Sequence, residues 1–263
     1  MVIRSPTLTR GTGGAVLALA GATALAGLWR WKRLAHSMRA GESLADGAIA
    51  FQRPGATPHA PAVLVVGDST GVGTGAARPE DSIAGRLAAR FPNVTIVNRS
   101  ANGARTLDVL TQLAAEGPGR YDMVLVHAGG NDVIRRTPLR ALAPQVDVLM
   151  GAARRLSPNV IVTSLPNLGL VPMLFRPLSW WASRRSRQVT MLYEAAARRH
   201  GAYYADFFFE RGTCPFAKDP ARFYARDGLH PSGDLYGYVF ERLMESLPIE
   251  ARLTRPRLRP APG

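Results

Sequence analysis

Residues 62–69 read Ala-Val-Leu-Val-Val-Gly-Asp-Ser and carry the clearest structural signal in the chain. Five apolar residues in a row are typical of a strand that is buried on both faces, as in a parallel sheet. A glycine, an aspartate and a serine follow at once, where this strand ends and a helix begins. We therefore expect the hydroxyl of Ser69 at the carboxyl edge of a sheet, where open α/β sheets bind their ligands.

Short apolar runs continue to alternate with helical segments along the chain. We expect further strands at 94–97, 123–126, 160–163 and 203–205, and helices at 80–90, 106–115, 138–156, 183–200 and 232–247. Strands that alternate with helices predict a parallel sheet, here of five strands, with helices on both faces. The expected fold class is therefore α/β, in three layers.

Length and charge limit the classes of function. The chain has 263 residues, 46% of them apolar, and a net charge of +14. The length predicts a single domain, or one domain with a short appendage. Residues 1–39 and 251–263 together hold ten basic residues and no acidic residue. Residues 40–250 hold 23 basic and 19 acidic residues. The body is therefore not a basic nucleic-acid surface. A single cysteine excludes an internal disulfide and a multi-thiolate metal site, and we expect no metal and no cofactor.

The first 39 residues are expected to form a separate hydrophobic helix with basic flanks. Residues 11–29 carry no charge, which just meets the length of a bilayer-spanning helix. We expect a membrane anchor; the alternatives are a signal peptide cleaved near Ala26 and a buried helix. The basic stretch after residue 29 favours a cytoplasmic body and the cleavage pattern favours export, so both sides of the membrane stay open.

The rest of the chain divides simply. Residues 40–60 are rich in Gly, Ala and Pro and are expected to be a linker, 61–248 the folded domain, and 249–263 a disordered basic tail. Residues 169–181 are unusually apolar. They are expected either to form a lid or acyl-binding loop or to pack over the core, and an exposed apolar patch there would favour a lipid substrate.

Five residues at the predicted sheet edge suit acyl transfer. A serine needs a base to become a nucleophile. Asp227 and His230 lie three residues apart, which lets the carboxylate bind Nδ1–H and leaves Nε2 free to accept a proton. Backbone N–H groups of Ser69 and Gly103 and the side-chain amide of Asn131 are donors of the kind that stabilise an oxyanion. Each residue alone is also explained by an ordinary helix cap or turn.

In this order and on these elements, the residues resemble the SGNH hydrolases, the GDSL esterase/lipase superfamily. The resemblance covers residues 62–247 and departs only at Thr70, where the family name has leucine and no catalytic role falls. It implies a flavodoxin-like fold and hydrolysis of carboxylic esters through an acyl-enzyme. It also implies catalytic roles for Ser69, Asp227 and His230, and an oxyanion hole made by Ser69, Gly103 and Asn131.

The resemblance implies a small-molecule or lipid ester as substrate. Two alternatives stay open: a carbohydrate O-acetyl esterase of the same fold, and a membrane-tethered binding module without turnover. An apolar tunnel at the site would favour acyl chains, whereas an open polar groove with aromatic platforms would favour a glycan. The presence of all five residues argues against the binding module.

Overall fold

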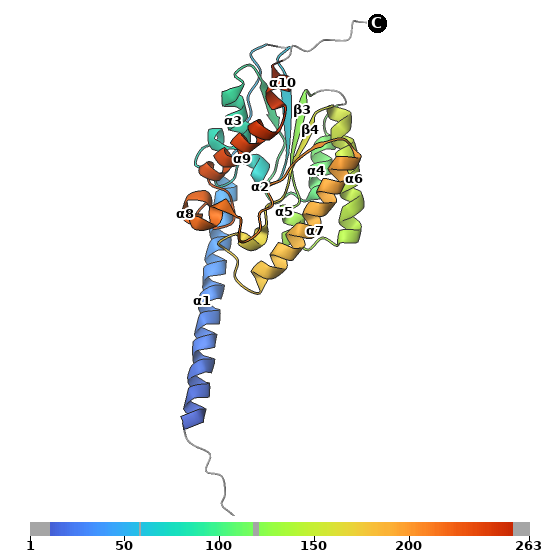
Figure 1. The fold of residues 1–263 in the computed structure, drawn as a ribbon. Coiled ribbons are helices and arrows are strands. Elements are labelled where there is room, and N and C mark those ends of the chain that lie inside the picture. Colours follow the sequence, from blue (N-terminus) through green and yellow to red (C-terminus); the bar gives the residue numbers. More distant parts are fainter. Residues whose placement is uncertain (1–10, 58, 118–120, 255–263) are drawn as a thin grey trace, which may run out of the picture.

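The computed structural model describes residues 11–57, 59–117 and 121–254, with side chains from Leu19 onward. A five-stranded sheet forms its centre (Figure 1). The strands are β1 (Ala62–Gly67), β2 (Thr95–Asn98), β3 (Met123–His127), β4 (Val160–Thr163) and β5 (Tyr203–Ala205). All neighbouring strands pair in parallel, in the order β2-β1-β3-β4-β5. The predicted parallel sheet of five strands is confirmed.

Helices cover both faces of the sheet, which confirms the three-layer α/β/α arrangement (Figure 1). One face packs against α4 (Thr106–Ala114), α6 (Leu139–Leu156) and α7 (Leu178–Arg199), and the other against α3 (Ile83–Arg90), α9 (Gly233–Ser246) and α10 (Ile249–Leu253). Side chains alternate between the faces of a strand, so Leu64 and Val66 enter the first core and Val63 and Val65 the second. Both cores exclude water from β1, which explains its unbroken apolar run.

Short elements complete the domain at the edges of the sheet. They are the helices α2 (Ser69–Val72), α5 (Gly130–Ile134) and α8 (Pro220–Phe223) and the 3-10 helices η1 (Pro79–Asp81), η2 (Leu168–Leu170) and η3 (Pro215–Lys218). The expected helix at 80–90 is divided at Ser82, whose Oγ accepts a hydrogen bond from the N–H of Gly85 and so caps α3. Ser232 caps α9 in the same way.

The predicted linker is wrong over much of its length. Helix α1 (Gly11–Gly47) continues eight residues into it. Arg53 then exchanges two backbone hydrogen bonds with Ile96 on the edge strand β2, and Phe51 packs against the core. The composition suggested a flexible connection, but backbone pairing and one aromatic side chain fix this segment to the domain.

The first half of α1 extends beyond the domain as a rod (Figure 1). The side chains of residues 19–33 are exposed, so this part of α1 is not a buried helix. Among the helices whose side chains are described, none combines the length and the apolar character needed to cross a bilayer. The predicted membrane anchor therefore finds no support in this part of the chain, and cleavage near Ala26 stays a prediction.

The prediction of a disordered tail from residue 249 is wrong for its first residues. Residues 249–253 form α10, and Ile249 and Leu253 are buried against the second core. Their spacing of four residues puts both side chains on one face of a helix, and burial of that face stabilises the turn. The remainder of the predicted tail, residues 255–263, lies outside the described residues.

Candidate active site

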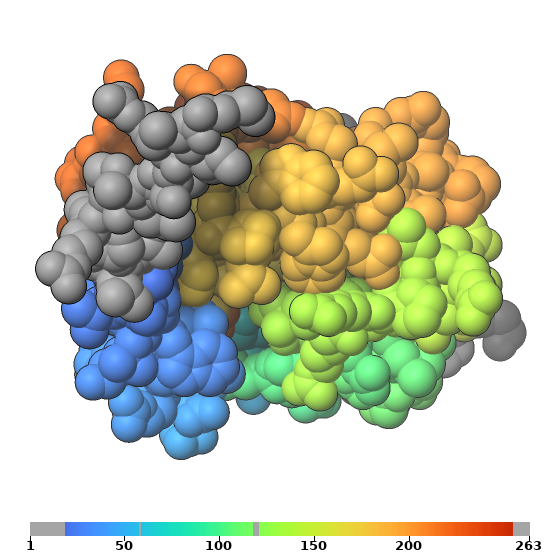
Figure 2. Space-filling model, turned by 90° about the horizontal axis from the view of Figure 1, so that it is seen from below, coloured from blue at the N-terminus to red at the C-terminus, as the bar shows by residue number. Residues whose placement is uncertain are grey.

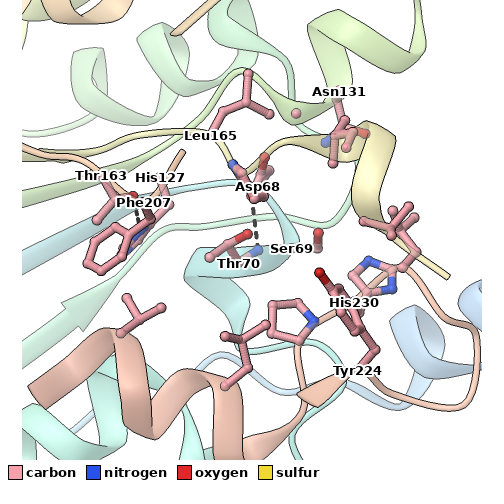
Figure 3. A pocket seen from close by; sticks show the side chains of 18 of the residues that line it. Asp68, Ser69, Thr70, His127, Asn131, Thr163, Leu165, Phe207, Tyr224 and His230 are labelled. Carbon is pink, nitrogen blue, oxygen red and sulfur yellow. Dashed lines mark hydrogen bonds between the residues drawn. The ribbon is translucent and has the colours of Figure 1, made fainter. Parts of the chain in front are cut away.

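The predicted site residues meet at the carboxyl ends of β1, β2 and β3. The strand order reverses between β1 and β3, and open α/β sheets bind ligands at such a switch point. Ser69, Gly103, Asn131 and His230 all line one cavity of about 320 Å³ at this point. Figure 3 shows the Ser69 side chain close to the His230 ring, with Asn131 on the same side of the cavity.

Local geometry presents Ser69 to this cavity. Gly67 ends β1 with a φ of +152°, and a Cβ there would lie 2.1 Å from the carbonyl oxygen of His127, so only glycine fits between the two strands. The next residue, Asp68, caps α2 by accepting a hydrogen bond of 2.9 Å from the N–H of Thr70. The capping role belongs to Asp68, so Ser69 is not the helix cap and its hydroxyl is free for another role.

Asp227 makes three hydrogen bonds, two of them to His230. Its Oδ2 lies 2.5 Å from His230 Nδ1, and its Oδ1 accepts from the backbone N–H groups of Leu229 and His230 at 3.0 and 3.1 Å. Because a carboxylate can only accept, Nδ1 carries the proton and Nε2 is left as the acceptor. Gly228, with a φ of +68°, makes the tight turn that brings the two side chains together.

The electrostatics of this pair favour an ionised carboxylate. The side chain of Asp227 is fully buried, and burial alone would raise its pKa. The hydrogen bonds from the His230 ring and from backbone N–H groups outweigh that effect, and the pKa of Asp227 lies below its usual value. Asp227 therefore keeps its negative charge near neutral pH and can stabilise a positive charge on His230.

Three hydrogen-bond donors belong to residues that line this cavity: Ser69, Gly103 and Asn131. Asn131 Nδ2 donates one proton to the carbonyl oxygen of Ala104 at 3.1 Å, which orients the amide and leaves its second N–H available. The backbone N–H groups of Ser69 and Gly103 have no acceptor among the described residues. Gly103 has a φ of +76°, and a Cβ there would make only an ordinary contact of 3.5 Å with Nη2 of Arg135, so the turn conformation, more than close approach, calls for glycine here.

Ser69 Oγ and His230 are not hydrogen-bonded among the described side chains, although both face the same cavity. Nucleophile and base are often further apart in an empty active site and draw together when substrate binds. Proton transfer from Ser69 to Nε2 of His230 therefore requires the two side chains to approach each other.

Residues 65–237 match the model of the GDSL-like lipase/acylhydrolase family. The chain belongs to this family. The matched region runs from β1 into α9 and contains all five predicted site residues. The family is therefore established, and the roles of its site residues in this chain rest on the geometry above.

Individual relatives agree with this family. GDSL-like esterase Rv1075c of Mycobacterium tuberculosis is 26% identical in an alignment of 197 residues that covers 70% of this chain and 61% of that protein. Two crystal structures share the fold. A lipolytic G-D-S-L protein from Veillonella parvula has 16% identity and a TM-score of 0.56, and the match covers 72% of this chain and 98% of that one. The extracellular lipase of Streptomyces rimosus has 20% identity and a TM-score of 0.55, and the match covers 72% of this chain and 100% of that one.

Asp132, which follows Asn131, fixes the position of α5 in this GDSL-family chain. It is buried and accepts hydrogen bonds from the N–H and Oγ1 of Thr106 and from Oγ1 of Thr137. These bonds tie α5, which carries Asn131, to the start of α4. The sequence analysis missed this role because the partners of Asp132 are distant in the chain or lie on a loop.

Two further titratable groups line the cavity. Burial raises the pKa of Asp68 to about 6, although hydrogen bonds from Thr70 act in the opposite direction. His127 is fully buried, with Nδ1 at 2.7 Å from Oγ1 of Thr163, and burial lowers its pKa to about 4. Figure 3 shows His127, Thr163 and Phe207 on the far side of Asp68 from His230. His127 is therefore neutral near pH 7 and belongs to the inner wall of the cavity.

Proposed function

We propose that the protein is a serine hydrolase that cleaves carboxylic esters through an acyl-enzyme intermediate. The main support is the 2.5 Å contact between Asp227 and His230 beside the cavity that also holds Ser69. This contact fixes the tautomer in which Nε2 accepts a proton. A further support is that Ser69, Gly103, Asn131 and His230 line the same cavity, since acyl transfer needs a nucleophile, a base and oxyanion donors around one reacting carbon.

The reaction follows from these positions. Nε2 of His230 accepts the proton of Ser69 as Oγ attacks the ester carbonyl carbon, and Asp227 stabilises the resulting imidazolium. The negative charge that develops on the carbonyl oxygen is held by the N–H groups of Ser69 and Gly103 and by the amide of Asn131. His230 then gives its proton to the departing alcohol oxygen, and the acyl group stays on Ser69. Water repeats the cycle and releases the acid.

The lining of the cavity favours an apolar acyl group over an acetylated sugar. Beyond Ser69 the wall consists largely of aliphatic and aromatic side chains, among them Leu170, Phe207, Phe209, Phe216, Leu235 and Val239. A glycan would need a polar groove with many hydrogen-bond partners. The apolar lining therefore supports esterase or lipase activity.

The test is hydrolysis of 4-nitrophenyl esters by the full chain, beside Ser69→Ala and a control, Ser246→Ala. Ser246 is exposed at the end of α9 and outside the site. We expect hydrolysis by the unmodified chain and by Ser246→Ala, and its loss in a folded Ser69→Ala. Hydrolysis that survives in Ser69→Ala would contradict the assignment of the nucleophile.

A further inference from the structure

The last turns of α1 are tied to the loops that carry the active site. Asn102 Nδ2 donates to the carbonyl oxygen of Ala45 at 2.9 Å, and Arg226 Nη2 donates to Oγ of Ser43 at 2.8 Å. Asn102 adjoins the oxyanion-hole glycine, and Arg226 adjoins the carboxylate that orients His230. Nearer the N-terminus of α1, Arg33 donates a hydrogen bond to the carbonyl oxygen of Pro172. The helix is therefore fixed to three separate loops around the site.

Contact with Asp227 is closest at Gly41. A Cβ at Gly41 would lie 3.1 Å from Oδ2 of Asp227, the oxygen that binds His230, which is tighter than an ordinary van der Waals contact. The helix backbone thus passes directly over this carboxylate and helps to remove it from water. This approach is possible because residue 41 has no side chain.

The same part of α1 forms a wall of two adjoining cavities. The first, of about 320 Å³, contains Ser69 and the oxyanion donors and is lined from α1 by Gly41, Glu42 and Ala45. The second, of about 370 Å³, is lined from α1 by Ser37, Met38, Gly41 and Glu42. Figure 2 shows the surface hollowed between the blue of α1 and the gold of the segment that follows β4. Both volumes are at the lower end of the ~300–1,000 Å³ typical of ligand pockets.

The two cavities meet at His230, which lines both. Opposite α1, the second cavity is walled by apolar side chains of the segment after β4 and of α5, including Ile134, Met173, Leu174 and Trp181. In these walls Glu42 is the one charged side chain that lines both cavities, at their exposed rim. An ester bound at Ser69 therefore has apolar surface available on both sides of its carbonyl carbon.

The chemistry assigns one cavity to each side of the ester. The acyl carbon becomes bonded to Ser69, and its oxygen must reach donors that line only the first cavity, so the acyl chain extends there. The alcohol oxygen receives its proton from His230, and the alcohol group therefore leaves on the side of His230, toward the second cavity.

We propose that residues 37–45 of α1 are part of the substrate-binding site and set the lengths of the two groups of an ester that is apolar on both sides of its carbonyl. This inference rests on the proposed function and deepens it. Ala45 lines only the acyl cavity and Met38 only the alcohol cavity, so the two ends of the segment control different halves of the substrate.

The experiment measures kcat/KM of the full chain on two ester series with a pH-indicator assay. One series varies the acid from acetate to laurate with ethanol as the alcohol, and the other varies the alcohol from methanol to octanol with butyrate as the acid. The variants are Ala45→Phe, which puts a larger side chain on the wall of the first cavity, and Met38→Trp, which does so on the wall of the second. Ala26→Phe is the matched control, because Ala26 is exposed in the first half of α1 and lines neither cavity.

For the unmodified chain we expect kcat/KM to rise by about fourfold for each methylene until a cavity is filled. Ala45→Phe should lower kcat/KM on the longest acids by tenfold or more, with little effect on acetate esters or on the alcohol profile. Met38→Trp should do the reverse, and Ala26→Phe should match the unmodified chain.

Equal losses on short and long esters in a folded variant would overturn the inference, as would unchanged profiles in both cavity variants. Should Ala45→Phe fail to fold by circular dichroism, Ala45→Leu provides the same test with a smaller side chain. If the unmodified chain hydrolyses no ester in either series, the proposed function fails and this inference with it. If the unmodified chain is active but both cavity variants keep its dependence of kcat/KM on acid and alcohol length, the role of α1 is overturned and the proposed function stands.

Discussion

Replacement of Asp68 by asparagine is expected to remove a loss of stability that the protein suffers as the pH rises. The side chain of Asp68 is buried beside Ser69, and burial raises its pKa from 3.8 to about 6. A carboxyl group with a raised pKa binds its proton more tightly in the folded protein than in the unfolded chain. The free energy of unfolding therefore falls as the pH rises from 3.8 through 6 and then levels off.

The size of the effect follows from the shift. A shift of about two pKa units corresponds to about 3 kcal/mol at 1.36 kcal/mol per unit, of which about 2 kcal/mol is lost between pH 4 and pH 8. Asparagine keeps an oxygen that can accept from the N–H of Thr70 and cap α2, but it has no charge to bury. The substitution can also change the free energy of unfolding by an amount that does not depend on pH. That amount cancels when the stabilities at two pH values are compared.

Urea unfolding of the unmodified chain and of Asp68→Asn at several pH values from 4 to 8 tests this reasoning. The stability of Asp68→Asn relative to the unmodified chain should rise by about 2 kcal/mol over this range. Asp46→Asn, at an exposed position on α1, serves as the control and should show no comparable change. A difference between Asp68→Asn and the unmodified chain that stays constant with pH would refute the raised pKa.

Three substitutions test other parts of the site. Asp227→Asn should lower kcat by roughly 10⁴, because an amide no longer holds His230 in the tautomer that accepts a proton; a loss under tenfold in steady-state kinetics would contradict this. Asn131→Ala should lower kcat by roughly 10²–10³ with little change in KM, whereas an effect on KM alone would exclude an oxyanion role. Gly103→Ala should cost roughly 1–2 kcal/mol in urea unfolding, because alanine resists a φ of +76°; equal stability would contradict the strain.

The sheet and the meeting of the site residues could be predicted from sequence because their signals are local. Each strand is a short apolar run, and each site residue follows a strand or precedes a helix. Once the strands are known, the rules of parallel sheets bring Ser69, Gly103 and Asn131 to one edge without any knowledge of side-chain contacts. Local signals failed over residues 178–182 of α7, ahead of the helix predicted at 183–200, because the buried residues there are the small Ser179 and Ala182.

The contribution of α1 could not be predicted because it depends on distant contacts. Residues 40–47 contain small and polar side chains that resemble a linker, and their fixed position comes from Asn102 and Arg226, which lie 57 and 183 residues away from their partners. The raised pKa of Asp68 has the same origin, since it reflects burial by several elements of the fold. The helix at 249–253 was missed because its two buried residues gain stability only from the core they cover.

The most direct test of the account is the reaction of the full chain with a serine-reactive alkyl phosphonate, followed by mass spectrometry of its peptides. The account predicts one phosphonate per chain, bonded to Ser69, and a reaction that slows by orders of magnitude when His230 is replaced by alanine. A folded protein that takes up no phosphonate, or that carries it on a different serine, would contradict the assignment of Ser69 as the nucleophile.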